Sequence, residues 1–114
     1  NSMKFKKSKR IYKLKNNNIK ITDIGDMLLK NNEQLTFKNG KSEYDVCKKN
    51  WGYYATPSIN NRLKKFKFRT FLVRNSMNNI YIFLVHKNKV LQFRKYIKEE
   101  RIFIIKELTN YKKN

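Results

Sequence analysis

The chain has 114 residues, the usual size of one domain, and its 28 Lys and Arg against 8 Asp and Glu give a net charge of +20. Aromatic residues make up 14% of it, which favours a folded domain over disorder, and the excess of cations favours a nucleic-acid partner over a membrane surface. A single Cys and a single His exclude an internal disulfide and a structural zinc site, and no apolar run has the length of a membrane span or a signal peptide.

The first twenty residues carry eight basic side chains and no acidic one. Their apolar content is too low to form a core, so residues 1–20 are predicted to be an extended basic arm that becomes ordered only against a partner. A flexible solubilising tail and a residual targeting segment are the alternatives. Residues 21–114 are predicted to form a single α+β domain with its core in residues 41–109. The arm supplies seven candidate RNA-binding residues: Lys4, Lys6, Lys7, Lys9, Arg10, Lys13 and Lys15.

Two elements are predicted next along the chain. Thr22 or Asp23 can cap a short helix that ends near Lys30. Residues 34–46 (QLTFKNGKSEYDV) then place Asn-Gly between two alternating segments, which predicts a β-hairpin with a type I′ turn over Asn39 and Gly40.

A strand and a helix follow this hairpin. Residues 44–48 (YDVCK) predict the strand, and residues 56–66 (TPSINNRLKKF) predict a helix with Thr56 as its N-cap and Pro57 at its first position. The apolar residues of this helix recur at helical spacing and would form one buried face: Ile59, Leu63 and Phe66.

The last third of the chain alternates again between strands and a helix. Residues 68–75 and 80–88 read as strands joined by the polar turn 76–79, residues 88–100 as a helix, and residues 101–108 as a closing strand. The helix would bury three apolar residues: Val90, Phe93 and Ile97.

The order β-α-β-β-α-β predicts a ferredoxin-like split β-α-β fold (βαββαβ) of the α+β class. It would have a four-stranded antiparallel sheet with two helices on one face, preceded by the basic arm, the short helix and a hairpin strand. In topology alone this resembles RNA-recognition-motif domains and several small ribosomal proteins, and Tyr81 and Phe83 alternate on the third strand, where such domains stack bases. The glycine-containing signature of the RNA-recognition motif is not present, and no other family motif is recognised.

Aromatic and basic residues gather around the predicted start of the helix over residues 56–66. A helix start suits phosphate, and aromatic rings beside it can stack on bases. A lone Trp in a small domain usually packs in the core, so we expect Trp51 to fill the space between sheet and loop, with base stacking as the alternative. No carboxylate lies between Asp45 and Glu99 to pair with the basic run, which favours phosphate contacts. The candidates here are Trp51, Tyr53, Tyr54, Arg62, Lys64, Lys65, Lys67, Arg69 and Arg74.

These features predict a structural RNA-binding protein without enzymatic activity, cofactor or metal. The expected partner is rRNA, with neighbouring subunits of a ribonucleoprotein, in an organellar (mitochondrial) ribosome or the bacterial cytoplasm; the lone Cys47 favours a reducing or matrix-like compartment over secretion. One alternative is a small metal-independent ribonuclease or toxin-like enzyme that uses His86 or a Tyr as acid or base. Another is a protein-interaction module whose charge reflects an AT-rich genome, since Lys, Asn, Ile, Phe and Tyr make up more than half of the chain.

Overall fold

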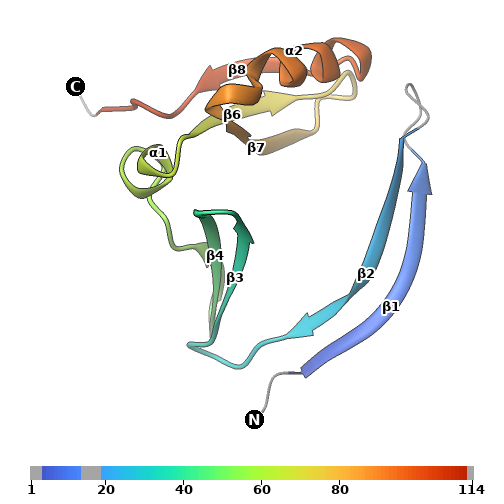
Figure 1. The fold of residues 1–114 in the computed structure, drawn as a ribbon, viewed down its shortest axis with the longest axis vertical. Coiled ribbons are helices and arrows are strands. Elements are labelled where there is room, and N and C mark those ends of the chain that lie inside the picture. Colours follow the sequence, from blue (N-terminus) through green and yellow to red (C-terminus); the bar gives the residue numbers. More distant parts are fainter. Residues whose placement is uncertain (1–3, 14–18, 113–114) are drawn as a thin grey trace.

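The computed structural model describes residues 4–13 and 19–112, and β-strands make up 53% of the described residues. In the described residues the strands form three separate antiparallel sheets of two, three and three strands, and the chain has two α-helices (Figure 1). The predicted four-stranded ferredoxin-like sheet with two helices on one face is therefore wrong.

The first sheet is a long curved hairpin of β1 (Lys4–Lys13) and β2 (Lys20–Leu28). The predicted helix from Thr22 or Asp23 to Lys30 is wrong: its β-branched residues favour a strand, and a central glycine disfavours a helix. Gly25 is needed where it stands: a Cβ there would lie 2.6 Å from the Phe5 ring and 2.5 Å from the Lys6 carbonyl oxygen. The division at residue 20 between arm and domain stays a prediction, although β1 pairs along its length with β2.

The second sheet contains the hairpin predicted around the Asn-Gly pair, extended by one strand. Its strands β3 (Gln34–Asn39), β4 (Ser42–Lys49) and β5 (Gly52–Ala55) pair in that order. The turn is shifted by one residue, since Asn39 pairs with Ser42 and Gly40 is the first central residue with φ +60°. Lys41 has no positive φ, so the turn has the Gly-first pattern of type II′ and not the predicted type I′.

The helix predicted over residues 56–66 is reduced to one turn, α1 (Arg62–Lys65). Thr56 does not cap it, because its hydroxyl donates to the Asp45 carboxylate 3.3 Å away. Ser58 sits closer to the helix start: its hydroxyl accepts from the Arg62 backbone N–H at 3.1 Å. Of the three residues predicted to form a buried face of this helix, Leu63 is fully buried, while Ile59 and Phe66 are half-buried.

The third sheet holds the core of the protein. Its central strand β6 (Phe68–Arg74) pairs on one side with β7 (Ile80–His86) and on the other with β8 (Phe103–Glu107). Between β7 and β8 the chain forms a 3-10 turn, η1 (Lys87–Lys89), and α2 (Val90–Glu99), which covers one face of the sheet (Figure 1). The buried core cluster is Phe71, Val73, Val85, Phe93 and Ile97.

From β4 onward the order of the elements was predicted almost correctly, but the prediction of which strands pair with one another was wrong. From β4 to β8 the predicted elements occur in sequence, with β5 as the one strand not predicted. However, β4 already has two partners, β3 and β5, each reached through a short turn. Short antiparallel connections cost little loop entropy, so β4 stays in its own sheet and the third sheet keeps three strands.

Candidate nucleic-acid interface

Three of the candidate arginines are neutralised by carboxylates of the same chain. Arg10 donates to Asp23 at 2.8 Å across the first hairpin, and this pair lies at the surface. The other two pairs, Arg62 with Asp45 and Arg69 with Glu107, join segments that are distant in the sequence. These three arginines therefore have carboxylate partners within the chain, and their part in RNA binding stays a prediction.

The Arg62 guanidinium donates to Asp45, which is only 2% exposed and lies 17 residues earlier in the chain. The Thr56 hydroxyl donates to the same carboxylate, and the Thr56 backbone N–H donates to the Asp45 carbonyl at 3.0 Å. The Thr36 hydroxyl on the neighbouring strand and the Arg62 guanidinium lower the pKa of the Asp45 carboxyl, against the opposite effect of burial. This cluster fixes the segment before α1 to the second sheet.

The Arg69 pair is bidentate, with 2.8 and 2.6 Å between its guanidinium nitrogens and the two Glu107 carboxylate oxygens. The Thr109 hydroxyl donates to Glu107 at 2.8 Å and accepts from the Thr70 backbone N–H at 3.0 Å. Hydrogen bonds from Arg69 and Thr109 hold the pKa of the Glu107 carboxyl below its ordinary value, and the same carboxylate raises the pKa of Arg69. The network ties the segment after β8 to the centre of the third sheet.

A group of lysines lines three adjoining cavities at the end of the third sheet nearest α1. The cavities have volumes of about 540, 390 and 560 Å³; the first two share Glu107 and Asn110, and the last two share Lys67 and Lys87. We call their lysines the lysine patch: Lys64, Lys67, Lys87, Lys106 and Lys112.

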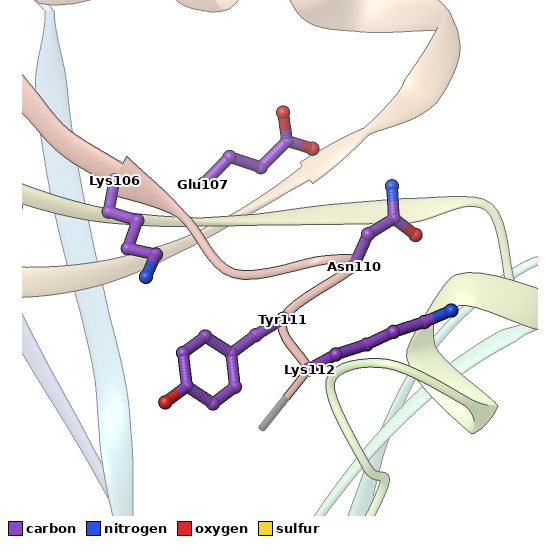
Figure 2. Close-up of a pocket in the computed structure, with 5 residues that line it drawn as sticks. All are labelled: Lys106, Glu107, Asn110, Tyr111 and Lys112. Atoms are coloured by element: carbon purple, nitrogen blue, oxygen red, sulfur yellow. The ribbon is translucent and has the colours of Figure 1, made fainter. Parts of the chain in front are cut away.

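The C-terminal segment forms one wall of the lysine patch. Figure 2 shows Lys106 and Tyr111 on one side of this segment and Asn110 and Lys112 on the other. The Lys106 ammonium lies 4.6 Å from the centre of the Tyr111 ring.

One hydrogen bond fixes the lysine patch to the C-terminal segment, and one ion pair engages the carboxylate that lines its cavities. The Lys64 ammonium donates to the Asn110 side-chain oxygen at 2.6 Å, which binds α1 to the C-terminal segment. Glu107 is the one carboxylate among the residues that line these cavities, and it is already engaged by Arg69. Among the described residues none of these five ammonium groups has a carboxylate partner, and such a surface around open cavities can accept phosphate groups.

The aromatic residues of the β4–β5 hairpin, Trp51 in its turn and Tyr53 and Tyr54 on β5, are exposed and do not contribute to the core. Trp51 is 68% exposed, so the expectation that it packs in the core is wrong. Its ring stacks on Tyr54 with 6.0 Å between centroids and 18° between planes, while the Lys48 ammonium lies 5.7 Å from the centre of the Tyr53 ring. Because α1 begins only at Arg62, these rings do not flank a helix start as predicted.

The resemblance to base-stacking sheets does not extend to the residues involved. Phe83 faces α2, with 6.0 Å between its ring centroid and that of Phe93, and Tyr81 lies next to Phe83 on the same face. The opposite face of β7 presents Ile80 and Ile82. An aromatic stacking platform is therefore absent from the open face of this strand.

The remaining candidates are dispersed. Lys6, Lys7, Lys9 and Lys13 are exposed along β1, which Lys4 begins, and Lys15 lies outside the described residues. Lys65 is exposed on α1 but does not line the cavities of the patch. The Arg74 guanidinium lies 4.7 Å from the centre of the Phe103 ring on the open face of the third sheet.

His86, the proposed acid or base of the ribonuclease alternative, has structural contacts. Its Nε2 shares a hydrogen bond of 3.1 Å with the Asn39 side-chain amide, and its ring lies 4.5 Å from the Phe68 ring centroid. The bond to Asn39 joins the third sheet to the second, and a 3.2 Å bond from the Ser42 hydroxyl to the Phe66 carbonyl joins the second sheet to the end of α1. The ribonuclease alternative stays a prediction.

Comparison with known proteins gives no independent indication of function, because no protein-family model, curated protein or solved structure matches the chain. Among the described residues no helix is long and apolar enough to cross a membrane. The same residues contain no cluster of His, Cys, Asp and Glu side chains suited to a metal ion.

Proposed function

We propose that the protein is a structural RNA-binding protein that contacts the phosphates of a folded RNA, specifically rRNA within an organellar or bacterial ribosome. The observation that carries the proposal is the lysine patch, where the one carboxylate, Glu107, is already paired with Arg69. Its ammonium groups, which have no carboxylate partner among the described residues, create a field that attracts polyanions and opposes close packing of the chain with itself. RNA phosphates would supply the missing counter-charge.

The β1 lysines and the exposed rings of the β4–β5 turn would provide additional contacts. Exposed lysines along a hairpin can follow an RNA backbone, and the stacked pair of Trp51 and Tyr54 offers an open aromatic surface to an unpaired base. Most contacts would be with phosphate and sugar, so binding would depend on RNA shape more than on sequence.

The test is the salt dependence of RNA affinity in a triple variant of the patch, Lys64→Gln, Lys67→Gln and Lys87→Gln, with purified ribosomal RNA as the probe. If each lysine neutralises one phosphate, removing three should flatten the slope of log affinity against log salt by about 2 to 3. The matched control changes three lysines outside the patch to Gln, with the same loss of charge: Lys89, Lys95 and Lys98. An equal change in both variants, or no change in either, would contradict the patch as the binding surface.

The identity of the RNA can be tested separately in native cells. The protein should sediment with ribosomal particles at moderate salt and dissociate as salt increases, since phosphate contacts are screened. A protein that sediments free of ribonucleoprotein particles at every salt concentration would rule out the ribosomal proposal, while RNA affinity in vitro would remain a separate result.

A further inference from the structure

The described part of the chain leaves one face of the third sheet partly uncovered. α2 covers the face that presents Phe71 and Val73 (Figure 1), and the opposite face is buried near α1, at Phe68 and Thr70. Beyond Thr70 the side chains of this opposite face are exposed or half-buried. They form the open face, in two rows across β7, β6 and β8: Ile82, Leu72 and Lys106 in one row, and Ile80, Arg74 and Phe103 in the next.

Most of the open face is apolar. Ile80, Ile82 and Phe103 are 60%, 50% and 48% exposed, and Leu72 on the central strand is half-buried. Single exposed apolar residues are common, but four that adjoin one another on one sheet face form a contiguous patch, which is typical of an interaction site. A sheet face of this composition is normally covered by another element, as α2 covers the other face.

The open face also carries two cations, Arg74 and Lys106. Their charged groups lie over the rings of Phe103 and Tyr111, and no carboxylate of the described residues pairs with either cation. An element that covers the open face removes both cations from water, which costs free energy unless each gains an anionic partner. The complementary surface is therefore apolar and carries carboxylates.

Other occupants fit these requirements less well. The residues outside the described ranges contain no Asp or Glu. A second copy would add a charge of +20 and has eight carboxylates, three of which already pair with arginines: Asp23, Asp45 and Glu107. RNA supplies anions, but its phosphates cover no apolar surface and its bases stack on aromatic rings, whereas three of the four apolar side chains of the open face are aliphatic.

We propose that the open face binds an acidic amphipathic helix of another protein. Apolar residues of this helix cover the aliphatic side chains of the open face, and its carboxylates pair with Arg74 and Lys106. A helix suits the face because α2 covers the other side of the same sheet through residues at helical spacing: Val90, Phe93 and Ile97. Helices that dock in this way do so through apolar residues at positions i, i+3, i+4 and i+7.

The test measures the binding of two synthetic peptides to the full chain by fluorescence anisotropy, after nuclease has removed RNA. The first peptide has about 18 residues, long enough to form a helix, with Leu at positions i, i+3, i+4 and i+7 and with Glu and Ala elsewhere. The second has the same composition in an order without an apolar face, so it controls for attraction to a chain of charge +20. The first should bind at least about tenfold more tightly, the change expected from burial of one aliphatic side chain.

Two substitutions locate the binding site. Ile82→Asn removes an apolar contact and Arg74→Gln removes a cation, and each should weaken the binding of the amphipathic peptide about tenfold. The matched controls make the same kinds of change on the solvent side of α2, Leu91→Asn and Lys95→Gln, and should leave that binding unchanged. Lys106 belongs to both the open face and the lysine patch, so it is left in place in all variants.

Equal affinity for the two peptides would overturn the proposal, and so would binding that the open-face variants and the controls change alike. If Ile82→Asn weakens the binding of ribosomal RNA, or abolishes self-association of the chain in sedimentation, the occupant is RNA or a second copy, which also overturns it. Circular dichroism shows whether each variant has kept its strands, and one folded open-face variant is enough to decide. Ile82 and Arg74 lie outside the lysine patch, so this proposal and RNA binding by the patch can fail separately.

Discussion

Replacing Asp45 with Asn should lower the free energy of unfolding by about 1.5 to 2 kcal/mol, since hydrogen bonds to charged groups contribute about 1.5 to 3 kcal/mol each. Asp45 is 2% exposed and accepts hydrogen bonds from Arg62 and Thr56. Asn keeps the shape of the side chain but loses the charge that Arg62 requires. The Arg62 side chain is 45% exposed, so water replaces part of the lost interaction and the cost stays at the lower end of the range.

The loss of unfolding free energy caused by Asp45→Asn should become smaller as the pH falls. The pKa of the Asp45 carboxyl is lowered in the folded protein, so its contribution is fully present above the ordinary pKa of Asp, about 3.9, and is lost as the pH falls through the lowered value. The difference between wild type and Asp45→Asn should therefore be constant near neutral pH and shrink in acid.

Urea denaturation followed by circular dichroism, repeated at neutral and acidic pH, measures this difference. Glu43→Gln is the control, because its contact with Lys38 is a long surface pair of 3.8 Å and its loss should change stability by less than about 0.5 kcal/mol. The reasoning fails if Asp45→Asn is as stable as wild type at neutral pH, or if its deficit is undiminished in acid.

Three further changes probe other parts of the chain. Gly25→Val would place a branched side chain against the Phe5 ring, so amide hydrogen exchange should become faster in the β1–β2 hairpin but not in the third sheet; unchanged protection would contradict the close packing. Glu107→Gln leaves Arg69 without its carboxylate, so the salt slope of RNA binding should steepen by about one phosphate contact, and a flatter slope would contradict the placement of Glu107 at the interface. Trp51 is the one tryptophan, and its fluorescence should be quenched by iodide in the free protein and protected by RNA; protection without RNA would contradict its exposure.

Local sequence patterns predicted several elements correctly because neighbouring residues determine them. Runs rich in aromatic and β-branched residues located β6 and β7, and helical spacing placed Phe93 and Ile97 of α2 in the core. The same reasoning failed for β2, where capping residues suggested a helix, but β-branched side chains favour a strand and Gly25 disfavours a helix.

Strand pairing and the choice of face could not be read from local patterns. Phe83 and Ile82 both fit a half-buried strand, and only the position of α2 decides which of them is covered. Likewise, nothing near Trp51 in the sequence indicates that β5 pairs with β4 and leaves the ring in solvent. These outcomes depend on contacts between elements that a linear pattern does not contain.

The charge distribution shows the same limit and changes the interpretation of the basic run. The absence of nearby carboxylates suggested that both the arginines and the lysines of the basic run were available to phosphate. However, Arg62 pairs with Asp45 and Arg69 pairs with Glu107, which lie 17 and 38 residues away in the sequence. The planar guanidinium suits such bidentate and buried partners, whereas the ammonium group of lysine is compact, strongly hydrated and kept at the surface. In this protein the arginines of the basic run therefore connect segments of the fold. The lysines carry the charge that faces a partner, so RNA affinity should follow the number of lysines in the patch more closely than the net charge of the chain.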